Sequence, residues 1–344
     1  MSAMRIHLGG KTVRILKVDP LNPEDDILKI ASDMIKNGKI VAFPTETVYG
    51  LGADAFNPSA VEKIFRIKKR PTGNPLIVHI SKIEHVNELV EDLDIRRMKV
   101  LERLWPGPIT FVLKKRSNLP DIVTGGLNTV AVRMPSHPVS VALIDMTGPI
   151  VAPSANLSGR PSPTKAQHVI DDFKDELDAI VDGGETIFGL ESSVIDLSGD
   201  HPILIRPGPI TIERLRNIFP DLVIDVDKIP SSSFDHYMTK KPLYLFIGTV
   251  EKIVKSILSF VEKRKKNFVL LCSEETKNMY PDNFRKVIMG SRVRPFSIAK
   301  RIFDIMRKVD KMDVDEILVE GIEEKGIGFT VMDRLRRSAL RIFE

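Results

Sequence analysis

The sequence contains very little cysteine and no long apolar segment. Its 344 residues include one cysteine, Cys272, so no disulfide bond can form within the chain and a reducing compartment is expected. No uninterrupted apolar run reaches the ~20 residues needed to span a bilayer, and residues 1–11 lack the apolar centre of a signal peptide. We therefore expect a cytoplasmic protein that does not associate with membranes.

Several common site motifs are also absent. The sequence has no GxxxxGK[ST] loop, no GxGxxG after a predicted strand, no HExxH and no paired CxxC, so it predicts neither the usual phosphate-binding loops nor a zinc site. None of its seven histidines stands at metal-ligand spacing from another histidine or from Cys272. No metal held by protein side chains is expected, and a bound nucleotide would depend mainly on cationic side chains.

The composition is otherwise that of a globular protein, with 42% hydrophobic and 28% charged residues. Domains usually run to roughly 100–200 residues, so two are expected. The 51 Lys and Arg residues against 46 Asp and Glu residues give a net charge of +5. That charge suits a polyanion such as a nucleotide or RNA, but it equally suits a well-solvated basic surface.

The apolar pattern predicts a first domain of the α/β class over residues 1–219. Short apolar runs alternate with amphipathic stretches from about residue 25 to 217, which is typical of helices packed on a mixed sheet. Strands are predicted at 40–43, 76–80, 109–114, 129–134, 150–152, 194–197 and 203–206, and helices at 95–104, at 138–146 and after Asn57. Asn57 should cap its helix, with Pro58 in the first turn.

Residues 220–241 predict a linker, because they combine proline with three consecutive serines. Residues 242–344 then predict a second domain. Its strands are predicted at 243–247, 267–272 and 316–320, and its helices at 250–264, 296–309 and about 331–342. This spacing favours parallel strands joined by right-handed crossovers, as in a small Rossmann-like domain.

Two segments of the first domain carry dense polar groups. In Phe43–Gly52 a strand enters a turn with two threonines, a carboxylate and a phenol, and then glycines that let a ligand approach the backbone. A turn capped by its own hydroxyls is the alternative. In Arg66–Pro75 four cations end a helix, where they either complement the helix dipole or bind phosphate. Phosphate binding is favoured, because such close cations repel one another without an anion.

Three later segments place arginines and hydroxyls near strand ends. Alternation puts Thr129, Ala131 and Arg133 on one strand face, where Arg133 could hold a carboxylate or phosphate, or lie in water at a sheet edge. Segment 151–164 is rich in small and hydroxylic residues, and segment 190–208 joins serines to an arginine. No histidine–acid pair lies beside those serines, so they are not expected to be nucleophiles. Such a set suits a reaction driven by positioning and charge neutralisation.

Together these segments resemble the Sua5/YrdC/YciO family. The matching stretches are FPTETVYGLGADA from Phe43, KKRPTGNPLIVHI from Lys68, LWPGPITFVL from Leu104, VAVRMPSHP from Val130, VAPSANLSGRPSPT from Val151, SSVIDLS and IRPGPI. The two-domain layout is similar to archaeal-type Sua5. The resemblance implies a YrdC-like twisted mixed-sheet domain with a concave basic cavity, followed by a smaller Rossmann-like parallel α/β domain.

The resemblance also implies a threonylcarbamoyl-AMP synthase, a nucleotidyltransferase that joins L-threonine, bicarbonate or CO2, and ATP, and releases diphosphate. A separate transferase complex would pass the threonylcarbamoyl group to adenosine 37 of tRNA, and Mg²⁺ would be held mainly through the ATP phosphates. The implied threonine contacts are Thr47, His79, Arg133, Ala152 and Ser192. The implied ATP contacts are Lys68, Arg70, Asn74, Thr129, Ser154, Ser162, Arg206 and Tyr237, with Lys68 and Arg70 as the catalytic groups.

Tyr237 lies in a segment that keeps only part of the family pattern. The pair His236-Tyr237 resembles a His-Tyr pair of Sua5 proteins, but Met238-Thr239 follows in place of Ala or Ser and Pro. We hypothesise that Tyr237 closes over the nucleotide; a ring that only anchors the linker is the alternative. An alternative function is a non-catalytic double-stranded RNA-binding protein, and weak RNA binding is also compatible with a synthase. A hydrogenase-maturation carbamoyltransferase would need the CxxC pairs that are absent.

Overall fold

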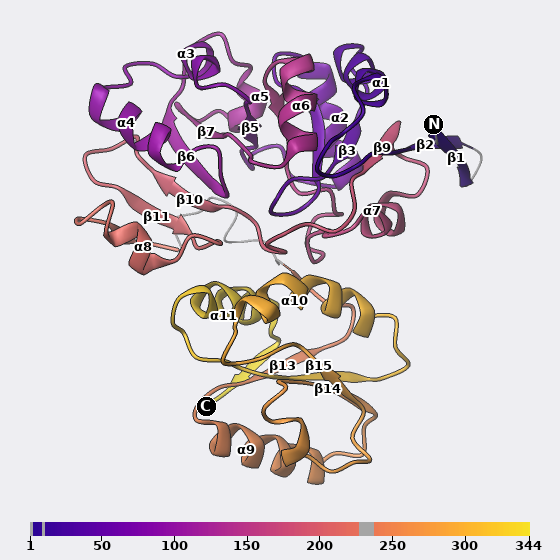
Figure 1. Ribbon diagram of the computed structural model, residues 1–344. Helices are drawn as coiled ribbons and strands as arrows, with labels where there is room; N and C mark the ends of the chain where they lie inside the picture. Colours follow the sequence, from indigo (N-terminus) through magenta and orange to yellow (C-terminus); the bar gives the residue numbers. More distant parts are fainter. Residues whose placement is uncertain (1–2, 9–10, 227–236) are drawn as a thin grey trace. The chain divides into compact units, whose positions relative to one another are not determined.

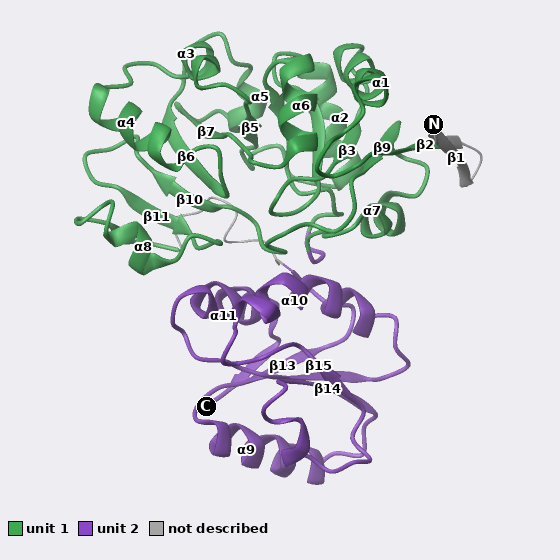
Figure 2. Cartoon of the chain, in the orientation of Figure 1, with its two compact units in different colours: residues 1–158, 162–233 green, residues 159–161, 234–344 purple. Residues whose placement is uncertain are grey.

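The computed structural model describes residues 3–8, 11–226 and 237–344, and the chain forms two compact units (Figures 1 and 2). Unit 1 consists of residues 1–158 and 162–233, and unit 2 consists of residues 159–161 and 234–344. Part of the proposed linker, residues 227–236, lies outside the described residues. Ahead of that gap, β12 (Val223–Ile224) still pairs with a strand of unit 1.

The sheet of unit 1 has twelve strands among the described residues, in the order β1-β2-β9-β3-β4-β8-β5-β7-β6-β10-β11-β12. Besides β12, the strands are β1 (Ala3–Leu8), β2 (Lys11–Lys17), β3 (Val41–Phe43), β4 (Gly50–Asp54), β5 (Ile77–His79), β6 (Ile109–Lys114), β7 (Thr129–Arg133), β8 (Ile150–Val151), β9 (Ala179–Asp182), β10 (Ser193–Asp196) and β11 (Ile203–Arg206). Parallel and antiparallel pairs alternate irregularly along it, so the predicted mixed sheet is confirmed.

Helices cover both faces of this sheet. They are α1 (Asp25–Lys36), α2 (Pro58–Lys68), α3 (Val86–Leu89), α4 (Ile95–Leu104), α5 (Asp121–Thr124), α6 (Pro138–Thr147), α7 (Ala166–Phe173) and α8 (Ile212–Arg216), with a 3-10 turn at Ile83–His85. Successive residues of β3 belong to two different buried clusters: Val41 packs with α1 and α6, and Ala42 packs with α2. The alternation of side chains along a strand thus gives unit 1 a core on each face.

The helix predicted after Asn57 begins at the predicted residue because local capping signals fix its start. The Asn57 side chain accepts a hydrogen bond from the amide of Ala60 at 3.1 Å, and Pro58 is the first residue of α2. The Asn57 side chain gives a partner to one N–H group of the first helical turn, and Pro58 has no N–H group that would need one. Helix α2 therefore starts where predicted and ends at Lys68, which delivers its cations to one loop.

The segment Phe43–Gly52 differs from its sequence-based interpretation. Gly50 and Gly52 do not extend the turn but lie in β4, which pairs antiparallel with β3. A side chain at Gly52 would place its Cβ 2.9 Å from the Phe43 ring. The glycines are needed for this close packing, and the turn itself is limited to the residues between Phe43 and Gly50.

Unit 2 is a five-stranded parallel sheet in the order β15-β14-β16-β13-β17, as predicted for a small Rossmann-like domain. The strands are β13 (Leu243–Phe246), β14 (Phe268–Cys272), β15 (Lys286–Ile288), β16 (Glu316–Glu320) and β17 (Arg341–Phe343); the helices are α9 (Val250–Glu262), α10 (Phe296–Val309) and α11 (Ile327–Ser338), with a 3-10 turn at Lys277–Met279. Helix α9 covers one face and helices α10 and α11 cover the other (Figure 1).

The last predicted helix needs correction. It was placed at about 331–342, but α11 covers Ile327–Ser338 and strand β17 follows it. Ile342 pairs with Leu245 of β13, so the apolar residues that prolonged the helical pattern belong to a strand. Cys272 is buried at the end of β14, as predicted. Within the described residues, no helix has the length and apolar character of a membrane span.

Candidate active site

The first element of the site is the turn between β3 and β4. Thr45 Oγ1 donates to the Val48 carbonyl at 2.7 Å and accepts the Thr47 amide at 3.2 Å. A hydroxyl that bonds its own backbone in this way stabilises a tight turn. Glu46 and Thr47 are both fully buried at the tip of the turn. Thr45 therefore has the capping role, and the next two side chains face the protein interior.

Arg133 is the centre of the site. It ends β7, which lies between β5 and β6, so the alternative of an edge-strand arginine in water is excluded. The side chain is 4% exposed. Its Nη1 donates to Thr47 Oγ1 at 2.8 Å, and its Nη2 lies 2.7 Å from Glu46 Oε1. The structure thus brings Thr47 and Arg133 together, with Glu46 as a third member.

His79 and Thr110 lie beside Arg133 on the neighbouring strands. In the sheet register, Arg133 is opposite His79 of β5 and opposite Thr110 of β6. Burial, with the charge of Arg133 as the second cause, lowers the pKa of His79 to about 3. The imidazole is therefore neutral near pH 7. Its Nδ1 lies 3.3 Å from the Ile77 carbonyl, and because a carbonyl only accepts, Nδ1 carries the proton and Nε2 is an acceptor.

Ser192 joins this row of residues from the loop before β10. Its Oγ lies 2.8 Å from Thr110 Oγ1. Arg206, the last residue of β11, donates from Nη2 to Ser192 Oγ at 3.0 Å and from Nε to the Ser192 carbonyl at 3.0 Å. Arg206 therefore fixes Ser192 in place and connects the predicted threonine contacts with the predicted ATP contacts.

Lys68 organises the loop that follows β8. The side chain is 1% exposed, and its Nζ donates to the carbonyls of Ser154 and Asn156 at 2.5 Å each. The Ser158 amide in turn donates to the Lys68 carbonyl at 2.9 Å. The hydroxyl-rich segment is thus wrapped around the end of α2, which explains why Lys68 and Ser154 lie together although 86 residues separate them.

Arg70 and Arg206 form a pair of like charges. Burial, with the charge of Arg206 as the second cause, lowers the pKa of Arg70 to about 10. Arg70 Nη2 donates to the Pro75 carbonyl at 3.2 Å, while its buried Nε has no hydrogen-bond partner among the described residues. Two guanidinium groups that repel one another in a buried site favour an anion between or beside them.

The remaining predicted residues differ in how near they lie to this centre. The Ala152 amide donates to the Ile77 carbonyl at 3.0 Å, and Ser162 Oγ bonds the carboxylate of Glu191. Asn74 is buried in the loop after α2. Thr129 is at the opposite end of β7 from Arg133, about 13 Å away for four residues of strand. The structure therefore does not bring Thr129 to the arginine end of the strand.

Tyr237 belongs to unit 2. Its ring stacks on Phe303 of α10 with centroids 5.1 Å apart, and the Arg334 guanidinium lies 5.3 Å from the ring centroid. These are the contacts of an anchored ring. They do not test the hypothesis that Tyr237 closes over the nucleotide, which stays a prediction. His236 lies outside the described residues.

Glu46 and Thr110 are site residues that the sequence interpretation did not single out. Glu46 was visible as the carboxylate of the turn, but its value depends on a contact with Arg133, 87 positions away in the sequence. Thr110 is one hydroxyl in a buried strand, and only the sheet register places it beside Arg133. Nonlocal pairing of this kind leaves no signal in a single sequence.

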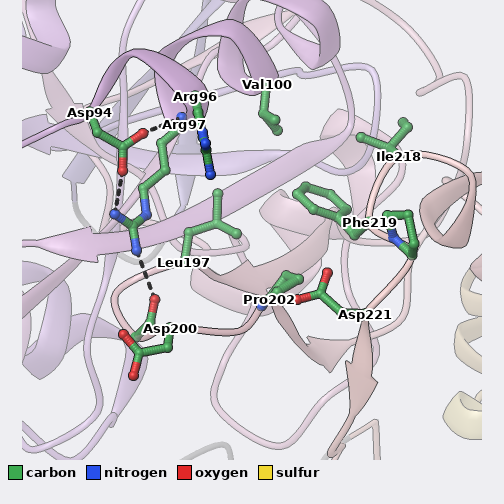
Figure 3. A pocket seen from close by; sticks show the side chains of 12 residues that line it. Asp94, Arg96, Arg97, Val100, Leu197, Asp200, Pro202, Ile218, Phe219 and Asp221 are labelled. Atoms are coloured by element: carbon green, nitrogen blue, oxygen red, sulfur yellow. Dashed lines mark hydrogen bonds and ion pairs between the residues drawn. The ribbon is translucent and has the colours of Figure 1, made fainter.

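A separate cavity of about 390 Å³ lies elsewhere in unit 1 (Figure 3). It is bounded by α4 and by the loops around β11 and after α8, with Val100, Leu197 and Phe219 as apolar walls. Charged side chains such as Asp94 and Arg97 line it as well, and these two form an ion pair at 2.6 Å. None of the predicted site residues lines this cavity.

The fold and this geometry define an α/β protein with a buried site of arginines and hydroxyls, suited to an anionic ligand. Residues 33–208 match the Sua5/YciO/YrdC family model, described as "Telomere recombination", and residues 210–340 match a model described as the C-terminal domain of threonylcarbamoyl-AMP synthase. The chain belongs to the Sua5 family of threonylcarbamoyl-AMP synthases, and its activity is that of this enzyme, a nucleotidyltransferase of tRNA t6A synthesis.

Individual relatives cover nearly the whole chain. It is 40% identical to threonylcarbamoyl-AMP synthase of Pyrococcus abyssi over 91% of this chain and 94% of that protein. It is 39% identical to the enzyme of Bacillus subtilis over 93% of this chain and 95% of that protein. The structure of P. abyssi Sua5 complexed with L-threonine has a TM-score of 0.89 at 39% identity, covering 96% and 98% of the two chains. Both curated relatives are threonylcarbamoyl-AMP synthases, so the alternative function, a non-catalytic RNA-binding protein, is not supported.

Proposed function

We propose that L-threonine, bicarbonate and ATP react in the buried site of unit 1, where the arginines divide the work. The observation that carries this proposal is a set of three guanidinium groups, of which Arg133 is buried, Arg70 and Arg206 are partly buried, and Arg206 holds Ser192. Arg133 faces Thr47 and His79, while Arg70 and Arg206 form the like-charged pair beside them. One anionic group at each location would relieve the cost of burying these charges.

The threonine half of the site is built around Arg133. Its planar guanidinium suits a carboxylate, which it can bind through two parallel hydrogen bonds. Thr47 and Ser192 offer hydroxyls, and the neutral His79 ring offers an acceptor at Nε2. The complex of P. abyssi Sua5 with L-threonine supports the choice of this amino acid. Ala152 would line the pocket, where a small side chain leaves room for the substrate.

The ATP half contains Lys68, Arg70 and Arg206. We assign their charges to the triphosphate, and the hydroxyls and amide of Ser154, Ser162, Thr129 and Asn74 to the nucleotide. The carbamate oxygen of N-carboxythreonine attacks the α-phosphorus, the new P–O bond forms, and the bond from the α-phosphorus to the bridging oxygen breaks. Diphosphate leaves with the electron pair, and cations near it stabilise the charge that develops. Exclusion of water protects the short-lived carbamate.

Magnesium would enter this site bound to ATP. Among the described residues, no group of three or more His, Cys, Asp or Glu side chains could hold a metal ion, and Mg²⁺ commonly binds through substrate phosphates and water. When bound, Mg²⁺ would neutralise part of the phosphate charge. The residues present fit such a role, because cations and hydroxyls rather than carboxylates surround the predicted phosphate position.

The wider setting of the reaction is also proposed. The single cysteine fits a reducing cytoplasm, which is where tRNA modification would use the product. A separate transferase complex would accept the activated threonylcarbamoyl group. The mild positive charge suits weak RNA binding, in line with a tRNA-directed product.

The test is a pyrophosphate-release assay with ATP, bicarbonate and Mg²⁺, with and without L-threonine, combined with mass spectrometric detection of threonylcarbamoyl-AMP. Release that depends on both threonine and bicarbonate is the expected result. Release without threonine, or an adenylate that lacks the carboxyl carbon of labelled bicarbonate, would contradict the proposed substrates. In crystals soaked with L-threonine and ATP, threonine should lie beside Arg133 and the triphosphate of ATP beside Arg70.

A further inference from the structure

Glu46 is a buried carboxylate with an unusually poor set of partners. The residue is 0% exposed, and neither carboxylate oxygen accepts a hydrogen bond from the described residues. Its one ion pair among the described residues, with Arg133 Nη2 at 2.7 Å, is close in distance but lacks the direction of a hydrogen bond. A carboxylate can accept about four hydrogen bonds, so most of the acceptor capacity of Glu46 is unused.

Backbone hydrogen bonds hold the turn that carries this carboxylate. The Glu46 carbonyl accepts the amides of Ile187 at 3.1 Å and Phe188 at 2.9 Å, and Thr45 stabilises the same turn from the other side. A buried carboxylate without hydrogen bonds is costly even beside one cation. A buried polar group of this kind calls for an explanation, and a ligand that completes its hydrogen bonds is one.

The neighbours of Glu46 indicate what that ligand is. Arg133 faces it directly, and His137 is near enough that the charge of Glu46 acts on its pKa. His79 faces Arg133 from the next strand. The local charge is therefore one cation and one anion side by side. An α-amino acid carries the complementary pair, a carboxylate and an ammonium group on the same carbon, so a carboxylate on Arg133 leaves the ammonium next to Glu46.

We propose that Glu46 binds the ammonium group of L-threonine and accepts one of the two protons that this group loses when it becomes a carbamate. The inference rests on the proposed function of the site. In the balanced step, the threonine ammonium and bicarbonate give the carbamate, one water and one proton. The ammonium group loses two protons as the N–C bond forms. A C–O bond of bicarbonate breaks, its hydroxide takes one of these protons and leaves as water, and the other proton goes to Glu46.

The two nearby histidines are less suited to this role. The pKa of His79 is lowered to about 3, chiefly by burial, so its ring is a weak base. His137 Nδ1 already accepts the Val139 amide at 3.2 Å, and burial lowers its pKa too. Of the groups that face Arg133 in the described part of the chain, Glu46 is the one with a negative charge and unused acceptor positions.

The first experiment measures ligand binding by calorimetry for the full chain and the variant Glu46→Gln. The ligands are L-threonine and 2,3-dihydroxybutanoate, which has a hydroxyl in place of the ammonium group. Loss of a charged hydrogen bond should weaken threonine binding about 10- to 100-fold, while binding of the hydroxy acid changes far less. A purely structural defect would weaken both ligands alike.

The second experiment follows the pH dependence of threonine-dependent pyrophosphate release. As the pH rises through the pKa of the threonine ammonium, the substrate arrives already deprotonated, so the deficit of Glu46→Gln should shrink. Glu46→Asp, which keeps the charge on a shorter side chain, should recover part of the activity at neutral pH. A deficit that stays constant with pH would contradict proton acceptance by Glu46.

Glu320→Gln is the matched control, because Glu320 is an equally buried carboxylate in unit 2; it should leave threonine affinity unchanged. Unchanged threonine affinity in Glu46→Gln would overturn the proposal, and so would an equal loss for both ligands. Tighter threonine binding would also overturn it, since Glu46 would then compete with the substrate for Arg133. If the unmodified chain neither binds threonine nor uses it, the proposed function fails instead.

Discussion

Unit 1 and unit 2 each bury a glutamate against an arginine, and the two pairs differ in what completes them. Glu46 lies 2.7 Å from Arg133, and Glu320 lies 3.4 Å from Arg292. Glu320 also accepts hydrogen bonds from Tyr280 at 2.5 Å and from other groups of unit 2. The carboxylate of unit 2 is thus satisfied by its own domain, and that of unit 1 is not.

The comparison separates a buried charge that is satisfied within the fold from a buried charge that is available to a ligand. Glu320 is the last residue of β16, at the carboxyl edge of a parallel sheet, which is where ligands often bind in such folds. There Thr276 and the Ser273 amide occupy the positions that a ligand would take, at 2.7 and 3.0 Å from the carboxylate. Position in the fold is therefore a weaker guide to a site than unused hydrogen-bonding capacity.

The largest expected effect comes from removing Arg133, the arginine of the pair in unit 1. Arg133→Ala should lower kcat/KM for L-threonine about 100- to 1000-fold, because a buried charge pair with the substrate is lost. The threonine requirement should rise more than the ATP requirement. Arg292→Ala should leave the kinetic constants for L-threonine and for ATP unchanged. Steady-state kinetics with each substrate varied in turn would measure this.

Arg133→Lys is the control for this variant, because it keeps a counterion for Glu46 but loses the planar fork. It should fall between the native chain and Arg133→Ala. A larger rise in the ATP requirement than in the threonine requirement would mean that the two halves of the site have been assigned the wrong way round.

The second prediction concerns stability. Glu320→Gln should lower the free energy of unfolding of unit 2 by about 1–3 kcal/mol, since the amide nitrogen would face donors from Ser273 or Thr276. Glu46→Gln breaks no protein hydrogen bond but leaves the buried charge of Arg133 without its counterion, so it should lower the free energy of unfolding of unit 1 by about 3–5 kcal/mol. Trp105 is the single tryptophan and lies buried in unit 1.

Urea unfolding can therefore follow the two units separately, with Trp105 fluorescence for unit 1 and circular dichroism for both. If saturating L-threonine, whose carboxylate can replace the counterion of Arg133, restored none of the stability of unit 1 in Glu46→Gln, the two glutamates would have the same structural role and the contrast would disappear.

The third prediction uses pH. The pKa of His79 is about 3 in the folded chain, lowered chiefly by burial, against an ordinary value of about 6.5 when unfolded. The unfolded chain therefore binds the proton first as the pH falls. The stability contributed by neutral His79 is complete above pH 6.5 and declines below it, by at most about 1.4 kcal/mol per pH unit, or about 2 kcal/mol at pH 5.

This loss should fall on unit 1, because residues 237–344 contain no histidine. His79→Gln should reduce the slope of unfolding free energy between pH 6.5 and 5, as followed by Trp105 fluorescence. An identical slope in the variant would show that His79 is solvated or protonated in the folded chain.

The sequence predicted the elements whose ends carry local signals. Helix α4 has the predicted bounds because Asp94 caps it, with its side chain accepting the Arg97 amide at 2.7 Å, and Trp105-Pro106 follows its end. Strands β6 and β11 also match, since their apolar runs are bounded by polar residues. The resemblance to a known family supplied the candidate site residues, which local patterns alone left undecided.

The sequence did not predict features that depend on distant partners. Strand β9 inserts between β2 and β3, and β17 exists because Ile342 pairs with Leu245; neither pairing leaves a mark in the local pattern. Glu46 was missed for the same reason, since a carboxylate in a turn is ordinary until Arg133 lies against it. Physical reading of one sequence thus identifies elements better than the contacts between them.

The smallest expected effect concerns Tyr237, the site residue that lies in unit 2. Its ring is held by Phe303 and Arg334, so Tyr237→Ala would disturb packing as well as any contact with ATP. Tyr237→Phe keeps the stacked ring and removes the hydroxyl. If that hydroxyl contacts the nucleotide, the KM for ATP should rise about two- to tenfold, with unfolding of unit 2 unchanged. Phe303→Leu is the complementary control, because it loosens the stack and keeps the hydroxyl. Unchanged ATP kinetics in Tyr237→Phe, with lower stability in Phe303→Leu, would make Tyr237 an anchor of unit 2 and leave the ATP contacts to unit 1.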